Sequence, residues 1–153
     1  MVDAIPEGYP RVTPYLIVAG AAAAIEFYSS VLGAKERMRM GGPDDKVGHA
    51  ELEIGDAVVM LADEHPEMDA LGPRSVGGTP VSLHVYVEDA DDVFARAIDA
   101  GAKELRPVED KFYGDRLGSF EDPFGHHWHV ATHVEDIPPE EMAKRAEAAT
   151  GGG

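Results

Sequence analysis

The chain has 153 residues, no cysteine and a formal net charge of −16. This length fits one domain or two fused half-domains. The lack of cysteine excludes disulfides, thiolate metal ligands and cysteine nucleophiles. The acidic balance disfavours nucleic acid and anionic membranes as partners, although solubility alone explains such a charge equally well. With no apolar run near the ~18 residues of a membrane helix and no apolar signal segment at the N-terminus, we expect a soluble cytoplasmic protein.

The first half of the chain predicts a strand, a helix and a hairpin, in that order. Apolar residues alternate over 12–18, which is typical of a strand with one apolar face. Ile25, Tyr28 and Leu32 follow at helical spacing, and Gly33 suits the end of that helix. Two further alternating stretches, split by Gly55 and Asp56, then predict a hairpin.

The second half repeats this order. Apolar residues alternate again over 81–87, and Asp89 is a suitable N-cap for a helix that ends near Gly101. A second hairpin turns at the sequence Pro-Phe-Gly, residues 123–125. In its last strand, parity places Trp128 and Val130 under the helix, where we expect them to be core residues.

The tetrapeptide Gly-Ala-Lys-Glu occurs in both halves, at 33–36 and at 101–104. Each half therefore reads β-α-β-β-β, and the chain is a duplicated module, since one such half could hardly bury a core alone. We expect a module at 10–64 and a module at 79–134, joined by a linker rich in Pro and Gly at 65–78. The tail at 135–153 predicts a short helix that ends in glycines.

Several local motifs resemble those of a known superfamily. "TPYLIV", "AIEFYSSVLGAKE", "GHAEL", "VSLHVYVED", "FYGDR" and "DPFGHHWHVATHVED" are similar to the PhnB-like subgroup of the vicinal oxygen chelate (glyoxalase, bleomycin resistance and dioxygenase) superfamily. The resemblance covers roughly residues 10–147. It implies an α+β fold in which helices cover one face of each curved mixed sheet and the other face encloses a pocket.

The strand face away from the helices is rich in polar and aromatic groups, and these are the candidate ligand-binding residues. Tyr15 and Tyr86 are placed to sandwich a planar ligand, with core packing as the alternative. Arg116 is placed to bind an anionic group, with an ion pair to Asp115 or Glu121 as the alternative. The full candidate set is Thr13, Tyr15, His49, Ser82, His84, Tyr86, Arg116 and His129.

The resemblance also implies where a metal would bind, because metal-dependent members take two ligands from each module. The matching positions are Thr13, Met60, Ser82 and His129, of which only His129 is a good ligand for a divalent ion. We therefore expect no cofactor. A displaced divalent metal site is the alternative, and it would draw on His49, Glu51, His84, His127 and His129.

Two functions remain. The first is a binding protein that holds a small planar, aromatic molecule in a metal-free pocket shared by the two subunits of a homodimer. The second is a lyase, isomerase or related enzyme that uses the displaced metal site or His84 as a general base. Met38, Met40 and Met60 are interpreted as core residues.

Overall fold

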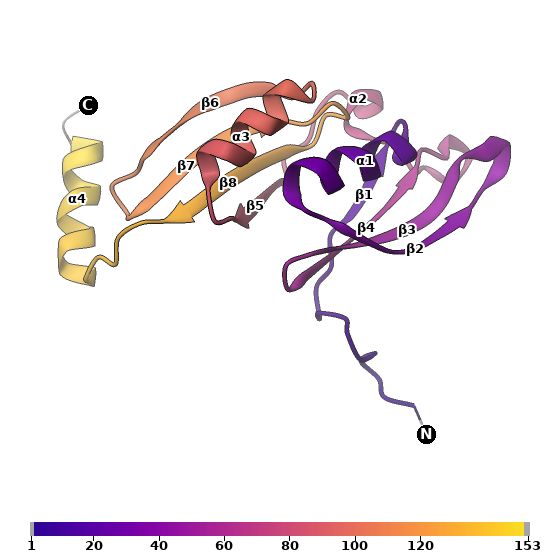
Figure 1. Ribbon diagram of the computed structural model, residues 1–153, viewed down its shortest axis with the longest axis horizontal. Helices are drawn as coiled ribbons and strands as arrows, with labels where there is room; N and C mark the ends of the chain where they lie inside the picture. The colour runs from indigo at the N-terminus through magenta and orange to yellow at the C-terminus, as the bar shows by residue number, and fades with distance from the viewer. Residues whose placement is uncertain (1, 152–153) are drawn as a thin grey trace. The chain divides into compact units, whose positions relative to one another are not determined.

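The computed structural model describes residues 2–151 and contains two four-stranded mixed sheets, each with one long helix (Figure 1). Contacts divide the chain into two compact units: the residues up to Pro80 together with Pro123–Gly125, and Val81–Asp122 together with His126 onward. The expected α+β fold with two β-α-β-β-β modules is confirmed. No helix within residues 2–151 is long and apolar enough to cross a membrane.

The first unit contains a sheet of order β1-β4-β3-β2, in which β1 and β4 are parallel and the other neighbours are antiparallel. Helix α1 covers one face. A 3₁₀ turn precedes β3, and the predicted linker holds a second 3₁₀ turn and a four-residue helix, α2. The elements are β1 Tyr15–Val18, α1 Ala21–Leu32, β2 Lys35–Gly41, β3 Val47–Ile54, β4 Ala57–Asp63 and α2 Pro73–Val76.

The second unit repeats this arrangement with the order β5-β8-β7-β6, covered on one face by α3. Beyond the β6–β7 turn stands α4, the helix predicted in the tail (Figure 1). The elements are β5 Ser82–Tyr86, α3 Ala90–Asp99, β6 Lys103–Asp110, β7 Asp115–Glu121, β8 His127–His133 and α4 Pro139–Gly151.

The helix ends follow the predicted signals in most respects. The Asp89 side chain accepts a hydrogen bond from the Asp92 N–H at 3.1 Å, so it is the N-cap of α3. Gly33 ends α1 in the left-handed conformation, with φ of 69°. At the corresponding place in α3 the C-cap is Ala100, and Gly101 follows it with φ of 107°.

The core of each unit lies between its helix and its sheet. Ala50 and Leu52 of β3, and Trp128 and Val130 of β8, are all buried on the helix side, as parity predicted. In the first strand of each unit, the buried apolar face begins later than the alternation predicted. Val12 is 84% and Val81 64% exposed. Both residues precede the first hydrogen-bonded pair of their strand, so neither lies under a helix.

Candidate functional site

The face of the second sheet away from α3, here called the second open face, carries a row of polar and aromatic side chains. Ser82, His84 and Tyr86 of β5 pair in parallel register with His127, His129 and Ala131 of β8. Side chains at alternate positions of paired strands share a face. The structure therefore brings most of the second half's candidate residues together.

His129 is fixed within this face. Its Nδ1 lies 2.6 Å from Ser119 Oγ, and its Nε2 lies 3.1 Å from Ser82 Oγ. Burial lowers the pKa of His129, and the nearby His84 and Arg106 lower it further. The lowered pKa favours a neutral imidazole. The two serine hydroxyls suit it, since a hydroxyl can both donate and accept a hydrogen bond. Both of its ring nitrogens are already engaged by serine.

His84 differs from the other histidines of the face. Its ring lies 5.1 Å from that of Tyr86 and 5.9 Å from that of His129, between centroids. Within residues 2–151 no hydrogen bond engages either nitrogen of His84, and the residue is exposed. By contrast, His127 Nε2 lies 3.1 Å from Glu121 Oε1. His84 is thus the imidazole on this face that is free to bond an incoming molecule.

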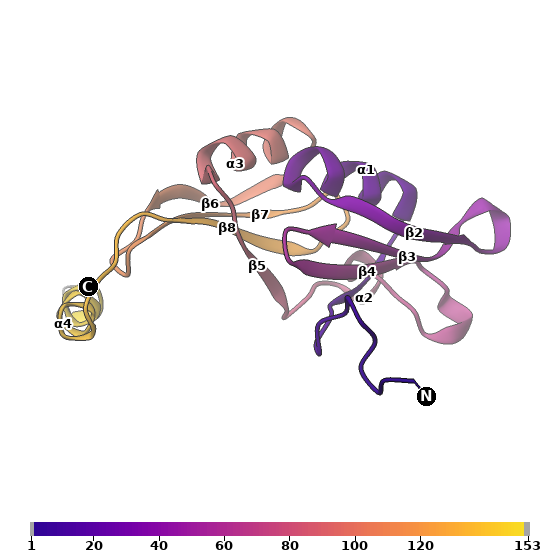
Figure 2. The same cartoon turned by 60° about the horizontal axis from the view of Figure 1, so that its bottom comes forward.

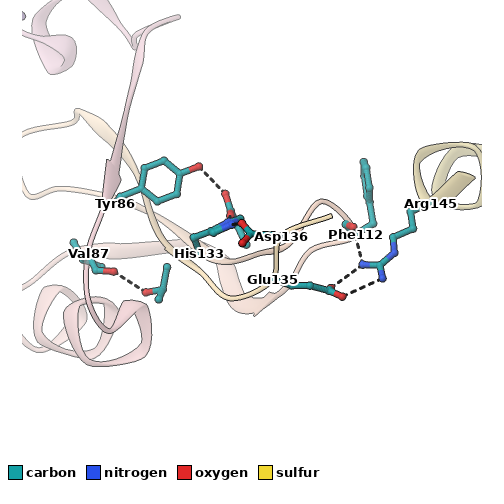
Figure 3. A network of polar contacts seen from close by, with 9 residues as sticks. Tyr86, Val87, Phe112, His133, Glu135, Asp136 and Arg145 are labelled. Carbon is teal, nitrogen blue, oxygen red and sulfur yellow. Dashed lines mark hydrogen bonds and ion pairs between the residues drawn. The ribbon is translucent and has the colours of Figure 1, made fainter. Parts of the chain in front are cut away.

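A polar chain connects Tyr86 to the C-terminal segment (Figure 3). The Tyr86 hydroxyl donates to Asp115 Oδ2 at 2.7 Å, and His133 lies 2.8 Å from Asp115 Oδ1 and 2.7 Å from Asp136 Oδ1. Burial by itself would raise the pKa of Asp115. The hydrogen bonds from His133 and Tyr86 outweigh this effect, so the pKa of Asp115 is lowered. The chain of hydrogen bonds fixes the phenol of Tyr86 while the residue stays 62% exposed.

Arg116 does not belong to this face. It pairs with Thr132 of β8, on the side of the sheet that α3 covers, and its guanidinium bonds both carboxylate oxygens of Asp91 at 2.7 and 3.0 Å. A further bond reaches Asp110. Arg116 therefore does not lie with the candidate ligand-binding residues, and its carboxylate partners are Asp91 and Asp110 rather than the expected Asp115 or Glu121.

The open face of the first sheet, here called the first open face, carries a second chain of hydrogen bonds. Tyr9 donates to Glu51 Oε1 at 2.6 Å, His49 Nε2 lies 2.9 Å from Glu51 Oε2, and the Tyr15 hydroxyl lies 2.8 Å from His49 Nδ1. Glu51 is only 5% exposed although it points away from α1. The N-terminal segment explains this, because it runs on the side of the sheet opposite α1 (Figure 2). Thr13 precedes β1 and is not among the residues that these hydrogen bonds link.

The residues present do not fit a metal centre. No group of three or more His, Asp or Glu side chains in residues 2–151 is arranged to hold a metal ion. Among the positions that the superfamily uses, Met60 offers a thioether and His129 is bonded to two serines. His49 and Glu51 of the displaced set bond each other.

Sequence reasoning missed Asp115, Ser119 and Tyr9. Alternation in β7 groups Asp115 and Ser119 on one face, opposite Phe120, so a parity reading of that strand would have found both. Tyr9 lies in an irregular segment, where no periodicity signals which side chain it will contact.

Comparison with known proteins agrees with this architecture. The family model described as Glyoxalase/Bleomycin resistance protein/Dioxygenase superfamily matches residues 9–130. An uncharacterized protein of Mycobacterium bovis is 43% identical over 136 residues, covering 87% of this chain and 90% of the relative. TioX from a Micromonospora species is similar in structure, with a TM-score of 0.63, 26% identity, and coverage of 82% of this chain and 99% of TioX.

The PhnB protein of Bacillus cereus shares the fold, with a TM-score of 0.63 at 20% identity over 80% of this chain and 99% of that one. The family match spans both modules and reaches into β8, so it includes His84, Tyr86 and His129. Together with the paired mixed sheets, these matches show that the chain belongs to the glyoxalase, bleomycin resistance and dioxygenase superfamily.

Proposed function

We propose that this protein binds a flat aromatic or heteroaromatic molecule on the second open face, without a metal. The observation that carries the proposal is the exposed pair formed by Tyr86 and His84. Tyr86 is 62% exposed yet held through its hydroxyl, and the adjacent His84 has both nitrogens free of partners within residues 2–151.

A fixed aromatic surface favours a planar ligand. The Tyr86 and His84 rings lie 5.1 Å apart at an interplanar angle of 53°, so a flat molecule can stack on one ring and meet the edge of the other. His129 adds a neutral imidazole at 5.9 Å from His84. Neutral donors and acceptors around aromatic faces suit heteroaromatic rings with a few polar atoms.

Charge limits the ligand class further. The chain carries a formal net charge of −16. Arg116, a cation placed here by the sequence interpretation, is neutralised by Asp91 on the other side of the sheet. A polyanionic ligand such as a polyphosphate would meet a repulsive field. Arg106, which lies opposite Ser119 and near His129, can offset one negative charge, so a neutral or singly charged molecule is the better match.

A catalytic role for His84 is the second candidate, and its free nitrogens are the observation in its favour. A general base is ordinarily held by a third group that orients its ring. His84 has only ring contacts, to Tyr86 and His129, within the described residues. Binding without turnover is therefore the stronger proposal for this face.

The test is a thermal-shift screen against heteroaromatic compounds, since a ligand of the folded state raises the melting temperature. Calorimetric titration of a hit should then show weaker binding to Tyr86→Ala by about 1–3 kcal/mol. His84→Ala should lose about 1 kcal/mol, the worth of one neutral hydrogen bond. Met68→Ala, at a 75% exposed position of the first unit, is the control and should bind like wild type.

If both site variants bind normally while folded, the ligand does not occupy this face. If His84→Ala binds normally but abolishes conversion of the compound, His84 is a catalytic base and the binding-only proposal is wrong.

A further inference from the structure

We propose that Tyr15, His49 and Glu51 on the first open face form a proton-transfer triad that removes a proton from a flat, uncharged carbon acid. Its residues all belong to the first unit, whereas Tyr86 and His84 belong to the second. The hydroxyl of Tyr15 is the group that meets the substrate, His49 takes up the proton, and Glu51 is a positioning residue for His49.

For a neutral His49 the hydrogen bonds permit one consistent placement of protons. Bonds from Tyr9 and His49 lower the pKa of Glu51, so its carboxylate is ionised and only accepts. His49 must therefore donate from Nε2 to Glu51. Its Nδ1 is left with a lone pair, which accepts the hydroxyl proton of Tyr15 across 2.8 Å.

Exposure decreases along the triad from the reacting end to the charged end. Tyr15 is 47% exposed, the His49 side chain 22% and the Glu51 side chain 6%. Partial burial and the nearby Glu51 raise the pKa of Tyr15, which keeps its hydroxyl protonated. The arrangement is similar to a relay of hydroxyl, imidazole and carboxylate groups, in which the buried carboxylate fixes the tautomer of the imidazole.

The step balances as follows. The oxygen of Tyr15 takes the C–H proton of the substrate while its own proton passes to Nδ1 of His49. The C–H electron pair remains on the substrate, where it forms a new π bond as a leaving group departs with its own pair. The imidazolium so formed lies against Glu51, and its proton returns through Tyr15 to solvent or to the departing group.

The surroundings of the triad indicate the substrate class. By register Met60 lies opposite Tyr15, Met38 opposite Glu51 and Met40 opposite His49. Met38 is 40% and Met40 51% exposed, so these side chains are not the core residues that the sequence suggested. Thioethers make an adaptable apolar surface that packs well on aromatic rings.

Arg37, a cation close to Glu51, does not favour an anionic substrate. Arg37 stacks on the Tyr9 ring, with its Cζ 4.5 Å from the centroid, and donates to the Gly8 carbonyl. It is thus engaged in holding the N-terminal segment. A flat, uncharged molecule with an acidic C–H bond fits a surface of three thioethers and one phenol.

Anchoring of the N-terminal segment does not account for the whole chain of bonds. The bond from Tyr9 to Glu51 would suffice for that purpose. A buried carboxylate–imidazole pair contributes little net stability, since desolvation offsets its attraction. The further link from His49 to the exposed Tyr15 does not involve Tyr9, and it is the part that the proton-transfer role requires.

The experiment uses the full chain and nitrobenzisoxazole, a planar carbon acid. Removal of its C–H proton breaks the ring N–O bond and releases a coloured cyanonitrophenolate, so atoms and electrons balance without a further reactant. Wild type should accelerate this reaction, and Tyr15→Phe should lose about a hundredfold of the rate, the typical worth of a positioned proton-transfer group. Tyr113→Phe removes a hydroxyl in the second unit and should leave the rate unchanged.

Glu51→Gln tests the positioning role. A glutamine amide that donates to Nε2 forces the proton of His49 onto Nδ1, which then donates to Tyr15. Nδ1 can no longer accept the proton of Tyr15, so proton transfer is blocked. Imidazole nitrogen NMR should show the Nε2–H tautomer in wild type and in Tyr15→Phe, and the Nδ1–H tautomer in Glu51→Gln, together with a similar loss of rate. Circular dichroism checks that each variant is folded.

Equal rates for wild type and Tyr15→Phe would overturn the proposal, and so would an Nδ1–H tautomer in wild type. Because these variants lie in the first unit and the binding variants in the second, failure of this triad leaves the proposed ligand-binding function standing, and the reverse also holds.

Discussion

His133 lies between two carboxylates, Asp115 and Asp136, at the end of the second open face (Figure 3). Both carboxylates raise the pKa of His133, and the hydrogen bond to Asp115 has the larger effect. The charged imidazole is thus favoured in the folded chain. Its contribution to stability is complete below the ordinary histidine value of 6.5 and is lost as the pH rises through the higher folded value.

We predict that His133 titrates above 6.5 in a pH series followed by NMR. Asp115→Asn should lower the midpoint more than Asp136→Asn, because Asp115 is nearly buried whereas the Asp136 side chain is fully exposed and screened by water. A midpoint unaffected by Asp115→Asn would show that the two groups do not interact in solution.

Trp128 is a second residue whose role can be tested. Its side chain is 2% exposed, and its indole N–H donates to the buried Asp122 at 2.9 Å. Trp128→Ala should lower the free energy of unfolding by about 3–5 kcal/mol, since it leaves a large cavity. Val134→Ala, at a position 55% exposed, should change it by less than about 0.5 kcal/mol. Wild-type stability of Trp128→Ala in urea unfolding would contradict this packing.

At the scale of elements, the start of α1 depends on a residue from another strand. The N-cap, Gly20, has no side chain, and no acidic residue lies in the first turn. Asp63, at the end of β4, accepts from the N–H groups of Gly20 and Ala21 through Oδ1 and from that of Val47 through Oδ2. It therefore connects α1, β3 and β4.

We predict that Asp63→Ala lowers the free energy of unfolding by about 1–3 kcal/mol, because it leaves backbone donors without an acceptor. Partial burial raises the pKa of Asp63, but the bonds from Ala21, Val47 and Gly20 outweigh it and the folded value is lowered. Its stabilisation is present above the ordinary value of 3.8 and is lost as the pH falls through the lower folded value. Urea unfolding at several pH values should show the gap between wild type and variant closing in acid.

The connection from β8 to α4 depends on Gly114. This glycine has φ of 96°, its carbonyl accepts from Val134 and Glu135, and a Cβ there would overlap the Glu135 carbonyl oxygen. Arg145 of α4 then bonds Glu135 and the Phe112 carbonyl (Figure 3). The turn and the helix are therefore held by the same short segment.

We predict that Gly114→Ala destabilises this segment by about 1–3 kcal/mol more than Gly77→Ala, the matched control. Gly77 has nearly the same φ, 95°, but open space where a Cβ would stand, so it reports conformational strain alone. Hydrogen exchange of α4 should accelerate in Gly114→Ala and not in Gly77→Ala. Equal effects would mean that the close approach to Glu135 does not form.

At the scale of the whole molecule, aromatic and thioether groups of both open faces are exposed in the single chain. Tyr86 is 62%, Met40 51% and Tyr15 47% exposed. Exposed apolar surface of this kind favours association, and a symmetric pair is the commonest soluble assembly. We predict a homodimer, so sedimentation velocity at micromolar concentration should give a mass twice the 16.4 kDa of the chain. A strictly monomeric species would contradict this.

The sequence by itself determined the fold and the faces of the strands. Hydrophobic alternation and helical spacing are local, repeated signals, and the duplicated order made each half a check on the other. They placed Trp128 and Val130 in the core and His49, His84 and His129 on open faces, and the structure agrees. The Asp89 cap is equally local, since donor and acceptor lie three residues apart.

Only the tertiary structure decided which polar groups are engaged and which are free. Arg116 bonds Asp91 across 25 residues, Asp63 caps α1 from 42 residues away, and Tyr9 reaches Glu51 across the same separation. Strand parity fixes the side of a sheet on which a residue lies, but not its hydrogen-bond partner, because that depends on register and on irregular segments. His84 therefore stands out from the other histidines only once their partners are known.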